Sequence, residues 1–233
     1  MNIALFGYGK MGKMIEQIAV ERGHTIVAKI DVDTQDINFG EMDVAIDFSM
    51  PDAAFGNISS CFTNGVPVIS GTTGWLSKYE EAVALCTKEK GAFIYASNFS
   101  LGVNIFFDLN EKLAKMMKAL TQYSVSMEEI HHTQKLDAPS GTAITLAEGI
   151  LEHTTYETWK LGNDVKKHEI AIDSKRIGTV PGTHTVTYES EVDGIEIKHT
   201  AHNRKGFALG AVIAAEWIKD RTGIFSMKDV LGL

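Results

Sequence analysis

Cysteine is scarce in this sequence, which holds only Cys61 and Cys86 among its 233 residues. Neither stands in a CxxC pair, so the sequence excludes a disulfide framework and a cysteine-based zinc site. Long apolar runs are missing as well, and none reaches the length of about 20 residues that a membrane span requires. The chain opens on a short apolar strand, without the basic start and long apolar centre of a secretory signal. We therefore expect a cytoplasmic protein with no membrane segment.

Positive charge is in deficit. Lysine and arginine together number 22 against 30 aspartates and glutamates, which gives a formal net charge of -8. A nucleic-acid partner is not expected, because its electrostatic footprint is lacking. Hydrophobic residues make up 44% of the chain, enough to bury the core of one large domain or two small ones.

The N-terminal segment carries the pattern of a dinucleotide-binding fold. An apolar strand at 3–6 precedes a GxGxxG sequence, a helical pattern follows it, and a strand at 25–30 ends on Asp31. The glycine-bearing residues are Gly7, Tyr8, Gly9, Lys10, Met11 and Gly12. A GxGxxG alone is a weak signal, but here the strand, the helix and the ribose-binding acid stand at the expected places. A glycine-rich turn with a chance acid in an ordinary α/β protein is the alternative interpretation.

The residue after Asp31 bears on the choice of cofactor. Val32 stands there, and no arginine is adjacent to hold a 2′-phosphate. Because the carboxylate of Asp31 accepts hydrogen bonds from ribose hydroxyls, the sequence favours NADH over NADPH. Lys10 or Lys13 remains within reach of a phosphate, so use of NADPH also stays open.

Alternating strands and helices continue to residue 101. Strands are predicted at 44–48, 66–70 and 92–95, and glycine- or serine-bearing loops follow the last two at 71–74 and 96–100. Ligands of an open parallel sheet bind outside the carboxyl ends of its strands, so these loops should line one crevice with 7–12. Plain turn chemistry is the alternative for each loop taken alone.

The pattern changes in the second half, which predicts a smaller α+β domain with a mixed sheet. It contains helices at 102–120 and 141–152 and period-two strands at 169–172 and 183–188. A two-residue Asp193-Gly194 hairpin is expected to lead into a last strand at 195–200. We assign 102–205 to this domain, and 1–101 with the buried helix and tail at 206–233 to a Rossmann-type domain. The strands of the domain at 102–205 would suit a sheet-mediated homo-oligomer.

Residues 129–143 concentrate protonatable side chains in one short segment. His131 and His132 are adjacent, and Lys135 follows closely. Neighbouring side chains of a strand face opposite sides, so only one of the two histidines should face a crevice. No HxxxH or HExxH spacing is present, and no metal site is expected. A structural histidine and a solvated lysine are the alternatives for these residues taken singly.

The same segment then starts a helix. Pro139 ends the preceding chain, Ser140 is the expected N-cap, and Gly141 and Thr142 bring backbone N–H groups to the helix start. Together with the Lys135 ammonium, this arrangement suits the carboxylates of a small dicarboxylic acid. Asp137 is expected to orient Lys135 or to accept turn N–H groups.

These residues resemble the signature of the hydroxy-tetrahydrodipicolinate (dihydrodipicolinate) reductase family. The resemblance extends along nearly the whole chain, through the segments 7–12, 46–49, 71–74, 97–104 and 202–204. It implies a dinucleotide domain, a tetramer-forming substrate domain, and reduction of a cyclic hydroxy-imine precursor to tetrahydrodipicolinate with loss of water. One departure concerns the cofactor, because Val32 replaces the basic residue of NADPH-preferring members.

The resemblance also implies roles for particular residues. The proton-transferring histidine falls on His131 and the catalytic lysine on Lys135, while His132, Gly141 and Thr142 contact the substrate beside Ser140. Cofactor contacts fall on the glycine-rich sequence, on Asp31, and on the loop residues Gly71, Thr72, Thr73, Ala96, Ser97, Asn98 and Phe99. The implied cofactor is NADH or NADPH, and the implied reaction needs no metal.

Two other functions remain open from the sequence. The first is a two-domain dehydrogenase of another amino dicarboxylate, resembling aspartate dehydrogenase. The second is an NAD(H)-sensing module without turnover, although a sensor has little use for His131, Lys135 and the helix start together.

Overall fold

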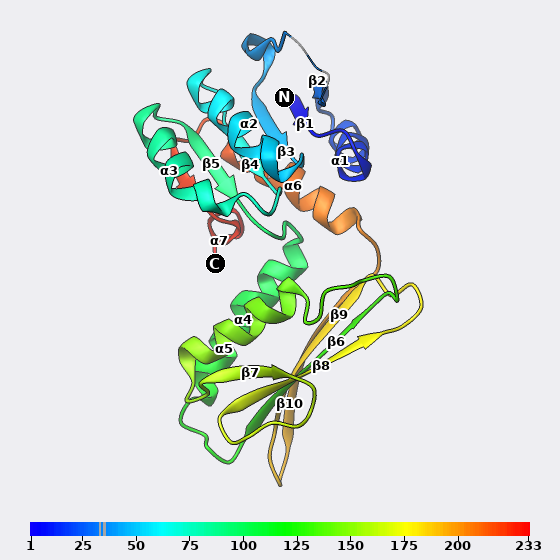
Figure 1. Ribbon diagram of the computed structural model, residues 1–233. Helices are drawn as coiled ribbons and strands as arrows, with labels where there is room; N and C mark the ends of the chain where they lie inside the picture. Colours follow the sequence, from blue (N-terminus) through cyan, green and yellow to red (C-terminus); the bar gives the residue numbers. More distant parts are fainter. Residues whose placement is uncertain (33, 35) are drawn as a thin grey trace. The chain divides into compact units, whose positions relative to one another are not determined.

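The computed structural model describes residues 1–32, 34 and 36–233, which form two compact units. The first comprises Met1–Leu101 and Lys205–Leu233, and the second comprises Gly102–Arg204. Figure 1 shows the two units, with the chain entering the second at α4 and leaving it after β10. Among the described residues, no helix combines the length and the apolar character needed to cross a bilayer.

The first unit is built on a six-stranded sheet, which confirms the predicted Rossmann-type architecture. Every strand pair in it is parallel. In spatial order the strands are β11 (Gly223–Phe225), β5 (Ala92–Tyr95), β4 (Val68–Ser70), β3 (Val44–Asp47), β1 (Asn2–Phe6) and β2 (Thr25–Ile30). Helices cover both faces, so the central strands are apolar on both sides.

Alternate residues of β1 show how the two layers form. Ile3 and Leu5 pack into one apolar cluster with the helices α1 (Lys10–Glu21) and α6 (Lys205–Ile218). Ala4 and Phe6 point the other way, into a cluster with α2 (Pro51–Thr63) and α3 (Tyr79–Lys88). The short helices are η1 (Phe39–Glu41), η2 (Leu76–Lys78) and α7 (Met227–Leu231). Burial of these faces is the main favourable term for the unit.

The C-terminal segment completes the first unit. Helix α6 is apolar nearly all round and fully buried at positions such as Ala211 and Ile218. Beyond it, β11 pairs with β5 and adds an edge strand that the sequence did not predict, because it has three residues and no alternation. The predicted capping box at the last helix is present, with Ser226 and Asp229 bonded reciprocally.

The second unit has a five-stranded sheet and two helices, which confirms the predicted mixed sheet with two helices and adds the strand β7, which was not predicted. Its spatial order is β10 (Gly194–Ala201), β9 (Gly182–Glu189), β6 (Ser124–His131), β8 (Glu169–Arg176) and β7 (Thr158–Leu161). Helices α4 (Leu101–Met117) and α5 (Gly141–His153) lie side by side on one face of this sheet (Figure 1). Phe106, Leu146, Ile172 and Val186 belong to the core between the helices and the sheet.

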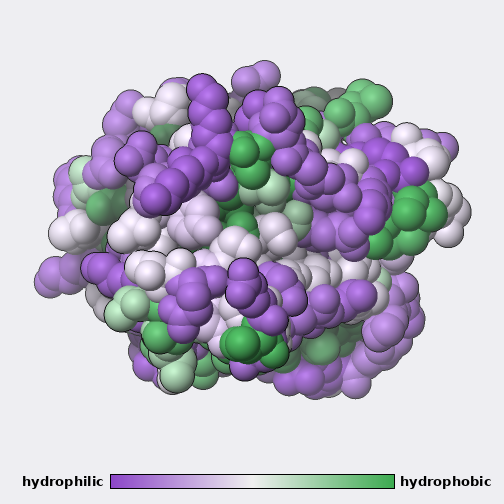
Figure 2. Space-filling model, turned by 90° about the horizontal axis from the view of Figure 1, so that it is seen from below, coloured by the Kyte–Doolittle hydropathy of each residue, from purple (hydrophilic) through white to green (hydrophobic). Residues whose placement is uncertain are grey.

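The other face of this sheet is polar. Register places Glu128 opposite Thr185, and Thr185 opposite Lys198, so these side chains share the face turned away from the helices. On the side of the molecule in Figure 2, hydrophilic residues likewise cover most of the surface, and hydrophobic ones form small separate patches. Contacts through such surfaces would depend on polar groups.

One turn differs from its prediction. The hairpin between β9 and β10 has a four-residue loop, 190–193, and not the two-residue Asp193-Gly194 turn. The Ser190 hydroxyl accepts the N–H groups of Val192 and Asp193, and the Ser190 N–H donates to the Asp193 carbonyl at 3.0 Å. These local bonds set the register in which Gly194 pairs with Glu189.

Candidate active site

The glycine-rich loop of the first unit has the close packing that its sequence requires. Gly7 adopts φ +87°, and a Cβ there would lie 2.3 Å from the Phe48 carbonyl oxygen. A Cβ on Gly12 would lie 2.4 Å from the Gly7 oxygen. Helix α1 begins at Lys10, and its N-cap, Gly9, offers no side-chain acceptor to the first-turn N–H groups. These donors suit a pyrophosphate, so the loop fits the dinucleotide predicted for it.

A cavity of about 580 Å³ lies beside this loop. Gly7, Tyr8, Gly9 and Asp31 line it, whereas the predicted contacts Lys10, Met11 and Gly12 belong to the first turn of α1 and do not. Its remaining lining residues come from the ends of β2 and β3 and from α2, and include Val32, Thr34, Phe48, Ser49, Asp52 and Asn57. The cavity is large enough for part of a nucleotide.

The loops after β4 and β5 are held by buried groups. Asp47 is 0% exposed and accepts the hydroxyls of Ser49, Ser70 and Thr72 at 2.6 to 2.7 Å. Thr72 is therefore committed to Asp47, so a cofactor contact there would fall to the backbone. Phe99 is also buried and packs on Phe48, with ring centroids 5.8 Å apart.

The remaining predicted loop residues are less enclosed. Gly71 has no room for a side chain, because a Cβ would lie 2.3 Å from the Phe48 ring. Thr73 and Ser97 are exposed, and Ala96 is half-buried. The Asn98 side-chain oxygen accepts the Ser100 N–H at 2.9 Å. These residues stay a prediction for the cofactor site.

In the second unit, β6 ends on the predicted histidine pair. Its alternation places Glu129 and His131 on the buried face, while His132 follows the strand and is half-buried. The strand register brings His184 of β9 opposite Glu129, and Arg176 of β8 opposite His131. His131 Nδ1 lies 3.6 Å from Glu129 Oε2, and the His131 and His184 rings are 5.0 Å apart.

His131 and Glu129 differ in their charge at neutral pH. Burial, followed by the neighbouring His184, lowers the pKa of His131 to about 4, although Glu129 opposes the shift. Burial alone would raise the pKa of Glu129, but hydrogen bonds from His184 and Ser140 outweigh it and hold that pKa well below its usual range. At neutral pH the unliganded site therefore holds a carboxylate beside a neutral imidazole.

The loop after β6 carries the predicted lysine. Lys135 Nζ contacts both oxygens of Asp137, at 2.7 and 2.8 Å, and its side chain is 21% exposed. Asp137 thus orients Lys135, one of the two roles expected for it. Arg176 Nε donates to the Lys135 carbonyl at 3.2 Å, and Arg176 Nη2 donates to that of Asp137. Arg176 of β8 therefore holds the lysine-bearing loop in place through these two hydrogen bonds.

Helix α5 starts where the sequence predicts. Ser140 is its N-cap and accepts the Ala143 N–H at 3.2 Å through its hydroxyl, which also lies 3.1 Å from His184 Nε2. Gly141 is exposed and Thr142 half-buried. Their N–H groups belong to the first turn, where the helix itself provides no acceptor. This end of α5 is a suitable place for a carboxylate.

Three residues that sequence reasoning missed complete the site. They are Glu129, Arg176 and His184, for which the sequence predicts no individual role. The signal for Glu129 was its two-residue spacing from His131 on one strand. Arg176 and His184 carry no local signal, since only strand register brings them to the motif.

Glu129, His131 and His184 have ligand atoms within 4.8 Å of one another, a spacing that a metal ion also accepts. The charges around Glu129 argue against a metal ion at this place. Glu129 Oε1 already lies 3.2 Å from Arg176 Nη2, and the Ser140 N–H donates to both carboxylate oxygens. A divalent cation would be added beside a guanidinium, so we interpret the group as a hydrogen-bonded network.

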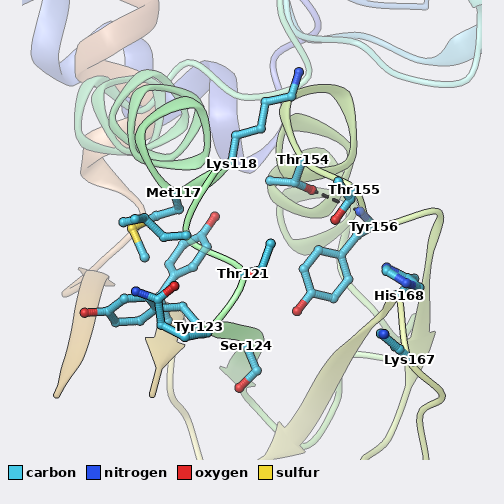
Figure 3. Close-up of a pocket in the computed structure, with 13 residues that line it drawn as sticks. Met117, Lys118, Thr121, Tyr123, Ser124, Thr154, Thr155, Tyr156, Lys167 and His168 are labelled. Atoms are coloured by element: carbon cyan, nitrogen blue, oxygen red, sulfur yellow. Dashed lines mark hydrogen bonds between the residues drawn. The ribbon is translucent and has the colours of Figure 1, made fainter. Parts of the chain in front are cut away.

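A separate cavity of about 420 Å³ lies elsewhere in the second unit (Figure 3). Lys118, Thr121, Tyr156 and His168 are among its lining residues, and it contains none of the segment 129–143. Tyr188 borders it, but its hydroxyl is enclosed. The cavity has no link to the chemistry of the motif.

Comparison with known proteins identifies the family of the chain. The family model described as dihydrodipicolinate reductase, N-terminus, matches residues 1–99, and that of the C-terminus matches residues 102–231. The 4-hydroxy-tetrahydrodipicolinate reductase of Christiangramia forsetii is 62% identical over 99% of this chain and 98% of its own length.

Solved structures show the same fold. A dipicolinate-bound dihydrodipicolinate reductase from a Paenisporosarcina species superposes with a TM-score of 0.77 at 23% identity, over 97% of each chain. An aspartate dehydrogenase from Thermotoga maritima reaches a TM-score of 0.53 at 13% identity, over 97% of this chain and 99% of its own. At these identities the likeness concerns the fold alone.

Proposed function

This chain belongs to the dihydrodipicolinate reductase family, and from that premise we propose which residues carry out its reaction. The reaction is the NAD(P)H-dependent reduction of 4-hydroxy-tetrahydrodipicolinate to tetrahydrodipicolinate with loss of water, in diaminopimelate and lysine biosynthesis. The observation that carries the residue assignment is the meeting of His131, Lys135 and the α5 start within one unit.

Substrate recognition in this proposal depends on carboxylates. The Lys135 ammonium, now paired with Asp137, would pair with one carboxylate of the substrate. Ser140 holds the helix start, and the Gly141 and Thr142 N–H groups would receive the carboxylate. His132, half-buried at the end of β6, would contact the ring. A dicarboxylate is the ligand that satisfies these donors together.

Proton transfer is assigned to His131. Bound NAD(P)H supplies a hydride to the conjugated ring, and a neighbouring ring atom then needs a proton. His131 is a buried imidazole at the end of β6, in the same segment as Lys135, which would withdraw charge from the anion that forms. A dianionic ligand would raise the pKa of His131 from about 4, which increases the protonated share when substrate is bound.

For the cofactor, we propose a preference for NADH. Asp31 borders the cavity, and the neighbouring Val32 is 79% exposed and uncharged. Lys29, the cation next to this site in sequence, is paired with Glu16 at 2.7 Å. Among the described residues that line the cavity, none is a lysine or an arginine. A 2′-phosphate would thus meet the Asp31 carboxylate there, and we expect kcat/KM to be about 10-fold higher with NADH.

Steady-state rates with each cofactor test this preference. Val32→Arg should shift the ratio toward NADPH, because it adds a charge beside Asp31. Val192→Arg is the matched control, since Val192 is equally exposed but belongs to the β9–β10 loop of the other unit. A wild-type protein that favours NADPH would refute the preference.

We also propose a homotetramer formed through the polar face of the second unit's sheet. That face carries no helix of its own unit, and Glu128, Thr187 and Lys198 offer complementary charge and hydroxyl groups. Light scattering with size exclusion should give four chains at low salt, and Thr187→Arg should reduce the measured mass without unfolding the protein. A wild-type monomer at micromolar concentration would contradict the proposal.

We further propose a cytoplasmic location, which is supported by Cys61 and Cys86, because both thiols are buried and unpaired.

One assay separates the proposed reaction from its rivals. The protein should oxidise NADH with the fresh product of dihydrodipicolinate synthase and not with oxaloacetate plus ammonia. Turnover of the second mixture alone would indicate an aspartate dehydrogenase. Cofactor binding without turnover of either would indicate a sensing module.

A further inference from the structure

Glu129 is a charged residue enclosed at the centre of the second unit. It is 0% exposed and lies on the middle strand β6, between His184 of β9 and Ser174 of β8. A buried carboxylate is costly unless neighbouring donors and cations compensate it. Its neighbours come from four segments, and each contact leads to a part of the proposed site.

The first contact is with the helix start. The Ser140 N–H donates to Glu129 Oε2 at 3.0 Å and to Oε1 at 3.2 Å. Ser140 is the N-cap of α5, so the bond fixes the residue immediately before Gly141 and Thr142. A shift of Ser140 would move the N–H groups proposed to bind the substrate carboxylate.

The second contact leads to Lys135. Arg176 Nη2 lies 3.2 Å from Glu129 Oε1, and the same guanidinium donates to the carbonyls of Lys135 and Asp137. Glu129 therefore anchors the arginine that holds the lysine-bearing loop. Without a carboxylate at this point, Arg176 would lose its partner on the buried side.

The third contact is with His131. Its Nδ1 is buried, has no hydrogen-bond partner among the described residues and lies 3.6 Å from Glu129 Oε2, an ion-pair distance. On the other edge, its Nε2 lies 3.1 Å from where a Gly182 Cβ would be. The ring is thus held between Glu129 and a glycine that leaves it room. A carboxylate favours the proton on the nitrogen that faces it, which leaves Nε2 as the nitrogen for exchange with a ligand.

We propose that Glu129 is a positioning residue for the reaction, acting through His131, Ser140 and Arg176 to hold the proton donor, the carboxylate cradle and the lysine loop in one geometry. The inference rests on the proposed site and adds a residue to it. The titratable or charged groups that face Glu129 are His131 on its own strand, Arg176 on β8 and His184 on β9. Arg176 supplies the cation that pairs with the buried Glu129 carboxylate, so the charge of Glu129 is compensated within this cluster.

Glu129→Gln tests the charge without changing the shape. We expect kcat to fall about 10-fold or more and KM for the dicarboxylate to rise, while the Kd for NADH stays unchanged. Because Glu129 raises the pKa of His131, its removal should move the alkaline limb of the pH–rate profile to lower pH. Glu148→Gln is the control, since it removes an exposed carboxylate of the same unit in the middle of α5, outside the site and outside the polar sheet face.

A spectroscopic measurement separates positioning from mere stability. ¹⁵N spectra of histidine-labelled protein should show His131 protonated on Nδ1 at pH 7 and lose that preference in Glu129→Gln. If Glu129→Gln does not fold, Glu129→Asp keeps the charge and should retain the tautomer with reduced kcat. Arg176→Lys should raise KM, because it weakens the hold on the lysine loop, and should leave the tautomer unchanged, because the Glu129 carboxylate stays beside His131 Nδ1.

The outcomes are distinct for the two proposals. A wild-type protein that turns over no dihydrodipicolinate synthase product overturns the proposed reaction. Wild-type turnover combined with a Glu129→Gln protein of equal kcat, equal pH profile and equal tautomer overturns the role of Glu129 alone.

Discussion

Replacing His131 with glutamine is expected to lower kcat by about 100-fold or more and to leave cofactor affinity unchanged. Glutamine keeps a hydrogen-bonding side chain of similar reach but cannot hold a transferable proton at neutral pH. The predicted cofactor residues lie in the first unit, so NADH binding should not respond. Single-turnover rates and fluorescence titration with NADH measure the two effects separately.

The pH dependence of the wild-type protein follows from the same residue. Imidazolium is the proposed donor, so rates should fall as pH rises through the pKa of His131. For the free protein that pKa is about 4, so the decline of kcat/KM with rising pH should be centred near pH 4. In the substrate complex the carboxylates raise it, so kcat should hold to higher pH. In His131→Gln, neither kcat nor kcat/KM should show this decline with rising pH.

Two histidine variants complete this experiment. His153→Gln changes an imidazole in the last turn of α5, outside the site, and should behave as wild type. His132→Gln should raise KM more than it lowers kcat, in keeping with a contact role. Turnover at the wild-type rate in His131→Gln would remove the proton-transfer role from that residue.

Replacing Lys135 with alanine is expected to lower kcat/KM by about 100-fold, through a higher KM and a lower kcat. The ammonium would serve two purposes, as a partner of a substrate carboxylate and as a sink for charge that develops after hydride transfer. Its pairing with Asp137 keeps it in place when no ligand is bound. Initial rates across substrate concentrations resolve the two parameters.

Two control variants change a different lysine–aspartate pair and the partner of Lys135. Lys112→Ala removes an exposed lysine that pairs with Asp108 on α4, and it should leave both parameters unchanged. Asp137→Asn frees Lys135 without removing it and should cost far less than Lys135→Ala. An unaltered KM in Lys135→Ala would exclude the carboxylate role, even if kcat fell.

Most elements of the fold were predictable because their signals are local. The apolar run at 3–6, the glycines after it and the alternation of strands and helices led to a parallel sheet with helices on both faces. The exceptions are informative. Strand β11 is too short to show a period, and the four-residue loop at 190–193 depends on the Ser190 hydroxyl, which competes with the Asp-Gly signal.

The candidate site divides in the same way. His131, Lys135 and Ser140 lie within ten residues of one another, so a strand end followed by a helix start already indicated their chemistry. Arg176 and His184 lie far along the chain and reach the motif through the pairing of β8 and β9 with β6. Burial of Glu129 likewise depends on the helices that cover this face of the sheet.

The sequence by itself determined the type of chemistry, because donors, acids and glycines at short spacing define a cofactor loop and an anion-binding helix start. Tertiary structure decided which histidine is enclosed, and it set the pKa of that histidine through burial and through neighbours contributed by other strands. It also placed one buried carboxylate, Glu129, beside His131 and Ser140 and connected it to the lysine loop through Arg176. The physical reason is that hydrogen-bond patterns within a segment are local, whereas burial and strand register are properties of the whole unit.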